Sequence, residues 1–253
     1  MQILLANAKI MLSPTEVAVK PLTIPAFQAE ADRLAKEMAR LNLDELAEQL
    51  GCSRQLALEN QQRYQNFFLA EKVPAIMAYN GRAYQALKAP TLDAAALSFA
   101  QEHLFITCFL YGLLRPMDAI VPYRMEHTVR LEATNDKPID RFWRDKLTDY
   151  LIRAVQADDG ILIHLSTGEY ERLFDWGRVS HEVKVIKPLF YVRRQGQLRM
   201  QAVWAKAGRG AMVRHLLQVA ADQPAALADF AYEGFSYAPH LGEPAFPHFV
   251  REA

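Results

Sequence analysis

Residues 183–204, VKVIKPLFYVRRQGQLRMQAVW, are the stretch that places the chain in a fold class. Their apolar and β-branched residues predict one strand over Val183–Val192 and another over Leu198–Trp204. The residues Arg193-Arg194-Gln195-Gly196 form a hairpin-like turn between them, so the two strands are expected to be antiparallel. A helix over Gly210–Ala221 is expected to follow directly from the second strand.

The rest of the chain supplies further strands and several helices. Gln2–Ala6 and Gly160–Leu165 are predicted as strands, the first because it is short, apolar and followed by polar residues. From Phe27 onwards apolar residues recur at intervals of four and three, the period of a helix that buries one face. The predicted helices are Phe27–Leu41, Leu43–Leu50, a helix from Ser53 toward Phe68, Thr91–His103 and Asp140–Gln156. The expected fold is therefore α+β (mixed α/β), a mixed sheet flanked by helices in a single domain over residues 1–253.

The composition is that of an ordinary globular protein, but its charges are unevenly distributed. Among 253 residues, 29 Lys plus Arg balance 29 Asp plus Glu and 51 % are apolar, which excludes a disordered chain, a collagen-like chain and a coiled-coil rod. Zero net charge at first argues against a nucleic-acid binder. Between Arg178 and His215, however, nine Lys or Arg accompany one acid, Glu182, whereas residues 216–253 carry five acids and one Arg. Such a basic band attracts polyanions even in a neutral protein, although a solvated strand face is the alternative explanation.

The two cysteines, Cys52 and Cys108, are far apart and belong to no metal-binding motif. A structural zinc site would need four closely spaced Cys or His ligands, and the seven histidines are scattered. We therefore expect two free thiols, no metal and no cofactor, with a Cys52–Cys108 disulfide as the alternative. The N-terminal residues 1–12 lack the basic leader of a secretion signal, and no apolar run is long enough to cross a bilayer, so we expect a cytoplasmic protein without membrane partners.

The segment from Lys206 to Arg214 is the first that could bind a ligand. Its two glycines, Gly208 and Gly210, would let a strand-to-helix turn approach an anion closely, and Lys206, Arg209 and Arg214 add positive charge. Free N–H groups at the start of the following helix would complete a phosphate site. The alternative is a plain turn with solvated basic residues, because the segment matches neither the P-loop nor the dinucleotide-binding pattern.

Two arginine–carboxylate pairs, Arg115 with Asp118 and Arg124 with Glu126, lie in a segment with two prolines. Prolines fix irregular backbone, where positioned side chains are common. The arginines could bind phosphate, while the carboxylates orient them or act as an acid–base pair. The alternative is that these pairs only hold a loop together.

His164, Ser166, Glu169 and Tyr170 lie at the end of the predicted strand Gly160–Leu165. Strand ends in α/β sheets are favoured ligand positions. The proximity of Ser166 to His164 suggests a hydrolase, but the GxSxG turn is absent and sequence proximity does not define a catalytic triad. A serine hydrolase is therefore disfavoured.

Residues 46–55, LAEQLGCSRQ, have the spacing of a transcription-factor helix-turn-helix, with Ala47 and Gly51 at its tight turn. An ordinary helical corner, in which Ser53 caps the second helix, produces the same pattern. The preceding helix carries three acidic residues, which disfavours contact with a phosphate backbone. The corner is the preferred interpretation.

The segments LYGLLRPMD (110–118) and PYRME (122–126) closely resemble the signature of the YaaA family of bacterial peroxide-stress resistance proteins. Other family motifs occur in the same order over nearly the whole chain. They are Lys9, Ser53-x-x-Leu56-Ala57-x-x-Asn60-x-x-Arg63-Tyr64, Asn80-Gly81-x-x-Tyr84, Leu165-Ser166-x-x-Glu169-Tyr170, Ile186-Lys187-Pro188-x-Phe190, Ala205-Lys206-x-x-Arg209-Gly210-x-Met212-x-Arg214 and Glu233-Gly234-Phe235. The combination is far more specific than any single motif.

The resemblance implies a mixed α/β domain with a positively charged cleft. It also implies that the corner at residues 46–63 is a helix-hairpin-helix-like element. It also implies sequence-tolerant DNA binding in the oxidative (hydrogen peroxide) stress response, limiting DNA damage and free intracellular iron. A monomer is expected. The residues expected to bind DNA or another anion are Lys9, Ser53, Arg63, Arg115, Tyr123, Arg124, Lys187, Lys206, Arg209, Gly210 and Arg214.

A second hypothesis is an enzyme of unassigned reaction that acts on a nucleotide or damaged nucleic acid in the same cleft. Its candidate catalytic residues are Asp118, Glu126, Ser166, Glu169 and Tyr170. Catalysis requires that they converge in one pocket with Arg115 and Lys206. Direct sequestration of iron is a third hypothesis, against which the missing ligand cluster argues.

Overall fold

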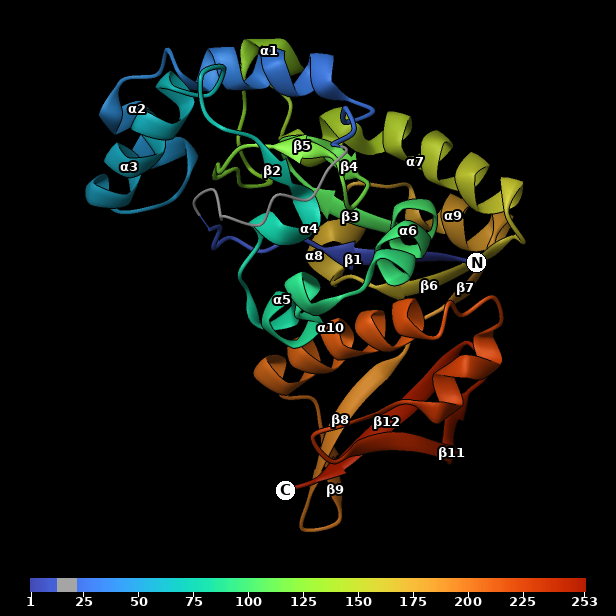
Figure 1. Ribbon diagram of the computed structural model, residues 1–253. Helices are drawn as coiled ribbons and strands as arrows, with labels where there is room; N and C mark the ends of the chain where they lie inside the picture. Colours follow the sequence, from blue (N-terminus) through green and yellow to red (C-terminus); the bar gives the residue numbers. More distant parts are fainter. Residues whose placement is uncertain (13–21) are drawn as a thin grey trace.

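Two five-stranded sheets form the framework of the molecule (Figure 1). The computed structural model describes residues 1–12 and 22–253. The strands of the first sheet are β1 (Gln2–Ala6), β3 (Leu104–Cys108), β4 (Gly112–Leu114), β6 (Ile161–Leu165) and β7 (Lys184–Ile186). Their order is β4-β3-β1-β6-β7, and all neighbours are parallel except β3 and β4. All five residues of β1 are buried, as expected for a central parallel strand.

The second sheet is mostly antiparallel. Its strands are β8 (Leu189–Arg194), β9 (Gln197–Arg199), β10 (Ala231–Tyr232), β11 (Phe235–Glu243) and β12 (Phe246–Glu252), in the order β10-β11-β12-β8-β9. The predicted hairpin between β8 and β9 is confirmed, and its turn residues Gln195 and Gly196 both have positive φ. A short separate pair joins β2 (Val73–Pro74) to β5 (Ala119–Ile120). The mixed α/β class is confirmed, with more than one sheet.

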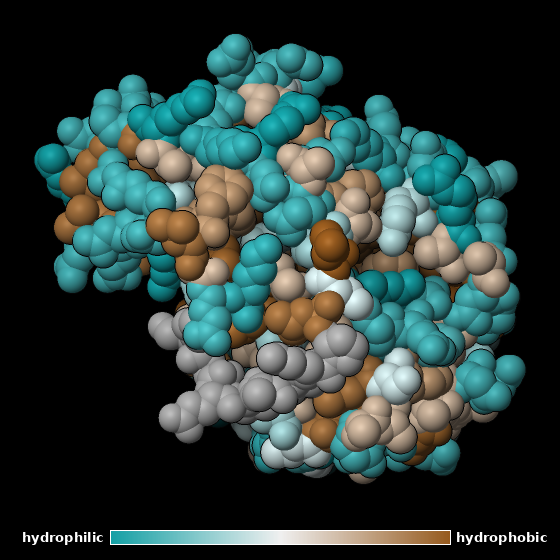
Figure 2. All heavy atoms as spheres, turned by 45° about the horizontal axis from the view of Figure 1, so that its top comes forward, coloured by the Kyte–Doolittle hydropathy of each residue, from teal (hydrophilic) through white to brown (hydrophobic). Residues whose placement is uncertain are grey.

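Helices surround the first sheet. They are α1 (Gln28–Met38), α2 (Leu43–Gln49), α3 (Arg54–Gln65), α4 (Ala75–Ala78), α5 (Arg82–Leu87), α6 (Ala94–His103), α7 (Ile139–Ala157), α8 (Gly168–Glu171), α9 (Trp176–Glu182) and α10 (Ala202–Gln218), with 3₁₀ turns at Ala89–Thr91, Glu132–Thr134 and Pro224–Asp229. None of the helices in the described part of the chain is long and apolar enough to cross a lipid bilayer. Most of the face shown in Figure 2 is hydrophilic.

Helix α10 lies between the two sheets (Figure 1). It contacts β1 and β6 on one side and β8 on the other. Gly208 makes the second contact possible, because a Cβ atom there would lie 2.4 Å from the ring of Phe190. On the other side of the first sheet, Trp143 of α7 donates a hydrogen bond of 2.7 Å to the carbonyl oxygen of Phe109. The first sheet is thus covered by packed helices on both of its faces.

The corner between α2 and α3 forms as its sequence predicts. Asn42 and Glu45 make a capping box at the start of α2, and the Ser53 hydroxyl accepts a hydrogen bond from Leu56 N at the start of α3. Gly51, with φ of +53°, ends α2 in the left-handed conformation.

The predicted strand Val183–Val192 is wrong as a single element. It is two strands, β7 and β8, which belong to different sheets. The break falls at Lys187 and Pro188, where proline has no N–H to donate to a sheet and Lys187 N donates to the carbonyl oxygen of Ala245. The segment therefore connects the two sheets.

The predicted strand Leu198–Trp204 is also wrong, because β9 ends at Arg199 and α10 begins at Ala202. The helix predicted over Gly210–Ala221 thus starts eight residues earlier and ends at Gln218. Trp204 and Val203 favour a strand by local propensity, but burial of Ala205, Gly208 and neighbouring small residues along one helix outweighs it. Residues 206–214 are consequently helix, with no strand-to-helix turn among them.

Candidate functional site

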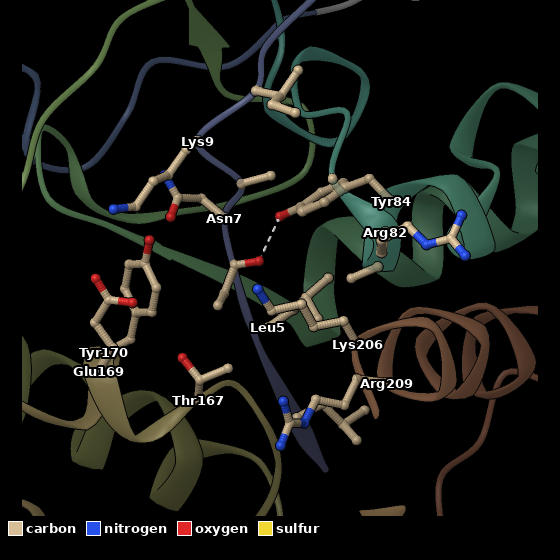
Figure 3. A pocket seen from close by; sticks show the side chains of 16 residues that line it. Leu5, Asn7, Lys9, Arg82, Tyr84, Thr167, Glu169, Tyr170, Lys206 and Arg209 are labelled. Atoms are coloured by element: carbon tan, nitrogen blue, oxygen red, sulfur yellow. Dashed lines mark hydrogen bonds between the residues drawn. The ribbon is translucent and has the colours of Figure 1, made fainter. Parts of the chain in front are cut away.

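A cavity of about 540 Å³ lies at the carboxyl ends of β1 and β6 (Figure 3). Its walls are the residues that follow β1 (Asn7–Ile10), the segment around α8 (Thr167, Glu169, Tyr170), the start of α5 (Gly81–Tyr84) and two side chains of α10 (Lys206, Arg209). Parallel sheets commonly bind ligands at this edge of their strands. The cavity is therefore the candidate site.

Close backbone contacts bring α5 and α10 to the end of β1. The Tyr84 hydroxyl donates a hydrogen bond of 3.1 Å to the carbonyl oxygen of Ala6. Gly81 lies so close to Ala8 that a Cβ atom on it would stand 2.7 Å from the Ala8 Cβ. Gly210 makes a similar contact with the carbonyl oxygen of Ala83. The expected role of Gly210 in cradling a phosphate is thus corrected, since Gly210 is a helical packing residue.

Lys206 and Arg209 form the cationic wall of the cavity. They are three residues apart on α10, so they share a face of the helix, and both side chains extend into the cavity in Figure 3. Among the residues that the structure describes, neither lies within 4.0 Å of a carboxylate oxygen. Burial lowers the pKa of the Arg209 guanidinium, and the Glu171 carboxylate counters this effect. The positive charge predicted in this segment is present, presented by a helix face.

Glu126 joins two of the expected cations. Its Oε2 lies 2.7 Å from Lys9 Nζ, and its Oε1 lies 2.8 Å from Arg124 Nη2. Lys9 also lines the cavity. One carboxylate therefore offsets the charge of two cations at this edge, so the Arg124–Glu126 pair holds the loop beside the cavity.

Tyr170 and Asn7 form the polar wall opposite α10. The ring of Tyr170 stacks on Phe109, with centroids 4.7 Å apart, and burial raises the pKa of its phenol. Asn7 Nδ2 donates to the Tyr123 hydroxyl at 3.2 Å, whereas the buried Asn7 Oδ1 has no hydrogen-bond partner among the described residues. Tyr123 itself is buried and its hydroxyl lies 3.0 Å from that of Tyr79, so it supports Asn7 from behind.

Lys187 is paired with a carboxylate beside the cavity. Its Nζ lies 2.6 Å from Glu171 Oε1, and the same oxygen lies 2.8 Å from Nε2 of the buried His164. These hydrogen bonds lower the pKa of Glu171 to about 2, while burial lowers the pKa of His164. Ser166 is buried and its hydroxyl contacts that of Thr107 at 3.4 Å, so a Ser166–His164 nucleophile pair does not form.

Arg115 and Asp118 lie away from the cavity. Arg115 Nη1 donates to Gln2 Oε1 at 3.0 Å and to the carbonyl oxygen of Leu104 at 3.3 Å, near the amino ends of β1 and β3. Asp118 is buried and accepts hydrogen bonds from Arg115 N and from the Thr23 hydroxyl. This corrects the expectation that Arg115 lines an anion cleft, because its hydrogen bonds hold a loop at the opposite edge of the sheet.

Arg214, Ser53 and Arg63 also lie outside the cavity. Arg214 Nη1 donates to the carbonyl oxygens of Leu87 and Lys88 and to the Thr91 hydroxyl, and so anchors the end of α5. Ser53 caps α3, and Arg63 donates to Asn60 Oδ1 and lines a separate depression on α3. Arg214 therefore does not contribute to the cavity, and its Nη1 is engaged by these hydrogen bonds.

The cavity also includes residues that sequence reasoning did not select as site residues. Asn7, Thr167 and Arg82 line it, and Figure 3 shows the Arg82 guanidinium pointing away from its centre. The polar residues after β1 and β6 were the available signal, because parallel strand ends meet at one edge. In residues 1–12 and 22–253, no group of three or more His, Cys, Asp or Glu could hold a metal ion.

Comparison with known proteins identifies the family. The family model of peroxide stress protein YaaA matches residues 1–241. A UPF0246 protein of Bacteroides thetaiotaomicron is 38 % identical over 245 residues, which cover 96 % of this chain and 95 % of that protein. A UPF0246 protein of Porphyromonas gingivalis is 38 % identical over 256 residues, covering 100 % of both chains, and one of Ruegeria pomeroyi is 36 % identical over 236 residues, covering 90 % and 91 %. The chain is a mixed α/β protein with a cationic cavity at a sheet edge, and it belongs to the YaaA family of peroxide stress proteins.

Proposed function

We propose that this protein binds DNA during peroxide stress and thereby limits DNA damage. The observation that carries the proposal is the pair of cations on α10, Lys206 and Arg209, which extend into the cavity. Neither has a carboxylate within 4.0 Å in the described part of the chain, so both charges are available to phosphate. The family supports the oxidative-stress part of the role.

The charge distribution favours few, sequence-tolerant phosphate contacts. Lys9, Arg124 and Lys187 each lie within 2.8 Å of a carboxylate oxygen, which offsets their charge. The net charge of the chain is zero. Phosphate contacts position a protein on DNA and carry no base information. We therefore expect a shallow salt dependence, to which Lys206 and Arg209 contribute a slope of about 2, at about 0.9 per phosphate contact.

Fluorescence anisotropy with a labelled duplex over a range of salt concentrations tests the proposal. Charge reversal of both cations, Lys206→Glu with Arg209→Glu, should lower affinity at least about tenfold and remove a slope of about 2. Lys137→Glu is the matched control, because Lys137 is an exposed lysine outside the cavity. Equal affinity and equal salt slope in the double variant and the control would overturn the proposal.

The corner between α2 and α3 is proposed as a second DNA contact. The N–H groups of Gly51 and Cys52 already donate to the carbonyl oxygens of Glu48 and Ala47, so side chains rather than turn amides would reach phosphate. Arg63 lies in the last turn of α3, away from this corner, so the corner is tested at the exposed first residue of α3: Arg54→Glu should reduce duplex affinity further when combined with the α10 variants. If the combined variant binds duplex as tightly as the α10 double variant alone, DNA binding is restricted to the cavity.

An enzyme that acts on a nucleotide or damaged nucleic acid is the second candidate function. The observation in its favour is that Glu169 and Tyr170 line the same cavity as Lys206. The expected convergence of all five candidates with Arg115 does not occur, because Asp118 and Ser166 are buried outside the cavity lining and Glu126 is engaged by Lys9 and Arg124. Incubation of oxidised duplex with the protein and with Glu169→Gln tests it, since a chemical change that only the unaltered protein produces would establish catalysis.

Limitation of free intracellular iron remains part of the proposal. Calorimetric titration of the pure protein with ferrous iron separates direct binding from an indirect effect. No heat of binding, together with lower free iron in cells that make the protein, would support the indirect effect.

A further inference from the structure

The two ends of the cavity differ in chemistry. Lys206 and Arg209 extend toward one end, and the Thr167 side chain lies between these cations and Glu169 (Figure 3). At the other end lie the Glu169 carboxylate, the Tyr170 phenol and Asn7. Cations at one end and hydrogen-bond acceptors at the other suit a ligand that combines an anionic group with N–H donors.

The cationic end fits a phosphate group. Lys206 and Arg209 approach from one helix face, and an arginine fork with a lysine point charge is a common phosphate-binding combination. Arg209 is half-buried in the wall, so its charge is less screened than that of a fully exposed arginine.

The acceptor end holds a buried acceptor without a hydrogen bond. Two donors, the Tyr170 phenol and the Lys9 ammonium group, also line this end, and Lys9 Nζ is paired with Glu126. Asn7 Nδ2 is committed to the Tyr123 hydroxyl, which leaves Oδ1 buried and without a partner among the described residues. A buried acceptor without a hydrogen bond is costly, and a ligand N–H that reached it would remove that cost. The Glu169 carboxylate is a second acceptor at this end and has no cation within 4.0 Å in the described part of the chain. The end therefore fits a group that presents two N–H donors.

Apolar side chains also line the cavity, among them Leu5, Ala8 and Leu165. The Tyr170 ring, fixed by its stacking on Phe109, adds an aromatic surface, and together these would suit one flat group. A volume of about 540 Å³ lies in the range of small-molecule sites. A base pair inside a duplex cannot present its Watson–Crick edge to such a cavity unless one nucleotide leaves the stack.

We propose that the cavity binds a single nucleotide, with its phosphate on Lys206 and Arg209 and an amino-bearing base against Asn7 and Glu169. That the nucleotide comes from bound DNA, extruded from the helix, rests on the proposed function. A free nucleotide offers the same chemistry. Guanine fits the acceptor end best because its edge presents a ring N–H and an exocyclic amine side by side.

Isothermal titration of the full chain with dGMP, dTMP, deoxyguanosine and inorganic phosphate tests the site. We expect dGMP to bind. The affinities of dTMP, which lacks the exocyclic amine, and of deoxyguanosine, which lacks the phosphate, should each be lower by at least about tenfold. Arg209→Met should remove the preference for dGMP over deoxyguanosine. Glu169→Ala should remove the preference for dGMP over dTMP. Lys137→Met is the control, and thermal unfolding verifies that each variant folds.

Several results would overturn the inference. They are the absence of dGMP binding at millimolar concentration, phosphate that binds as tightly as dGMP, and an unchanged base preference in Glu169→Ala.

A duplex that carries 2-aminopurine next to a guanine distinguishes the two sources, because 2-aminopurine emission rises when the guanine beside it leaves the stack. Rising emission on binding, lost in Arg209→Met, supports extrusion from DNA. Duplex binding without that rise and without dGMP binding overturns the cavity inference and leaves the proposed DNA binding intact. Binding of dGMP without duplex binding supports the cavity inference for free nucleotides and overturns DNA binding.

Discussion

Gly210 of α10 is in direct contact with the carbonyl oxygen of Ala83 in α5, so that a Cβ atom on residue 210 would lie 1.8 Å from that oxygen. The obstructing atom belongs to the backbone and cannot turn aside as a side chain could. This contact lets α10 pack directly against α5 beside the cavity. The position of Lys206 and Arg209 therefore depends on the absence of a side chain one residue beyond Arg209.

Gly210→Ala should destabilise the protein by about 3 kcal/mol, because the added methyl group forces the two helices apart. Chemical denaturation measures the free energy of unfolding. Gly177→Ala is the control, since Gly177 is an exposed helical residue of α9 with no atom closer than 3.6 Å to the added Cβ. Its expected effect is within about 1 kcal/mol, neutral or stabilising. Equal effects of the two changes would contradict the proposed role of the contact.

Substitution of Arg115 should lower stability and leave DNA affinity unchanged, whereas substitution of Arg209 should do the reverse. Arg115→Met removes two hydrogen bonds and the stacking of the guanidinium at 3.5 Å from the centre of the Phe105 ring. A loss of about 2 kcal/mol in stability is expected, with duplex affinity unchanged. Arg209→Met should weaken duplex binding and change stability by about 0.5 kcal/mol or less. Denaturation and anisotropy on both variants test this, and a loss of DNA affinity in Arg115→Met would return Arg115 to the binding surface.

Glu171 should contribute to acid denaturation. Its pKa falls from 4.5 to about 2 in the folded protein because His164 and Lys187 hydrogen-bond to its charged form. The unfolded chain therefore takes up this proton first, so the stabilisation is complete above pH 4.5 and is lost as the pH falls toward about 2. The lowered pKa of the buried His164 adds a loss that begins below its ordinary pKa of 6.5.

Glu171→Gln should flatten the dependence of unfolding free energy on pH between 4.5 and about 2. Denaturation at a series of pH values measures this slope. Glu252→Gln serves as control, because Glu252 pairs with Arg193 but its side chain is 72 % exposed. A slope in Glu171→Gln equal to that of the unaltered protein would show that Glu171 does not carry the acid transition.

The two cysteines should differ in reactivity. Both are free in the structure, Cys52 half-buried and Cys108 fully buried, which confirms the expected thiols. Burial raises the pKa of Cys108 to about 11, so its reactive thiolate is scarce at neutral pH. A thiol reagent should modify one cysteine in the native protein and two in denaturant. Equally rapid modification of both in the native state would contradict the buried position of Cys108.

Local sequence signals predicted the elements whose stability is local. The periodicity of α1, the Ser53 cap of α3, the Gly51 helix end and the turn at Gln195-Gly196 all occur as predicted. Each depends on residues within one or two turns of chain, where spacing and backbone preference are informative. The family motifs, likewise, are readable without a structure.

The predictions that failed depend on distant partners. Lys187 and Pro188 separate two sheets, and residues 202–209 are helical because small side chains pack between those sheets. Arg115, Arg124, Lys187 and Arg214 resemble one another as basic residues in motifs, yet their partners are Gln2, Glu126, Glu171 and Leu87. A cation's availability depends on what lies within a few ångströms of it, which sequence distance does not report.

Composition, periodicity and motifs were thus sufficient for the mixed α/β class, most helices and the family, because these follow from short-range preferences and from residue identity. The cavity required the folded chain, since its walls come from residues 5–10, 81–84, 165–170 and 206–209. Parallel strand ends and the Gly210–Ala83 contact bring those four segments together. Of the basic residues that the sequence singled out, packing leaves Lys206 and Arg209 facing the cavity without a carboxylate within 4.0 Å among the described residues.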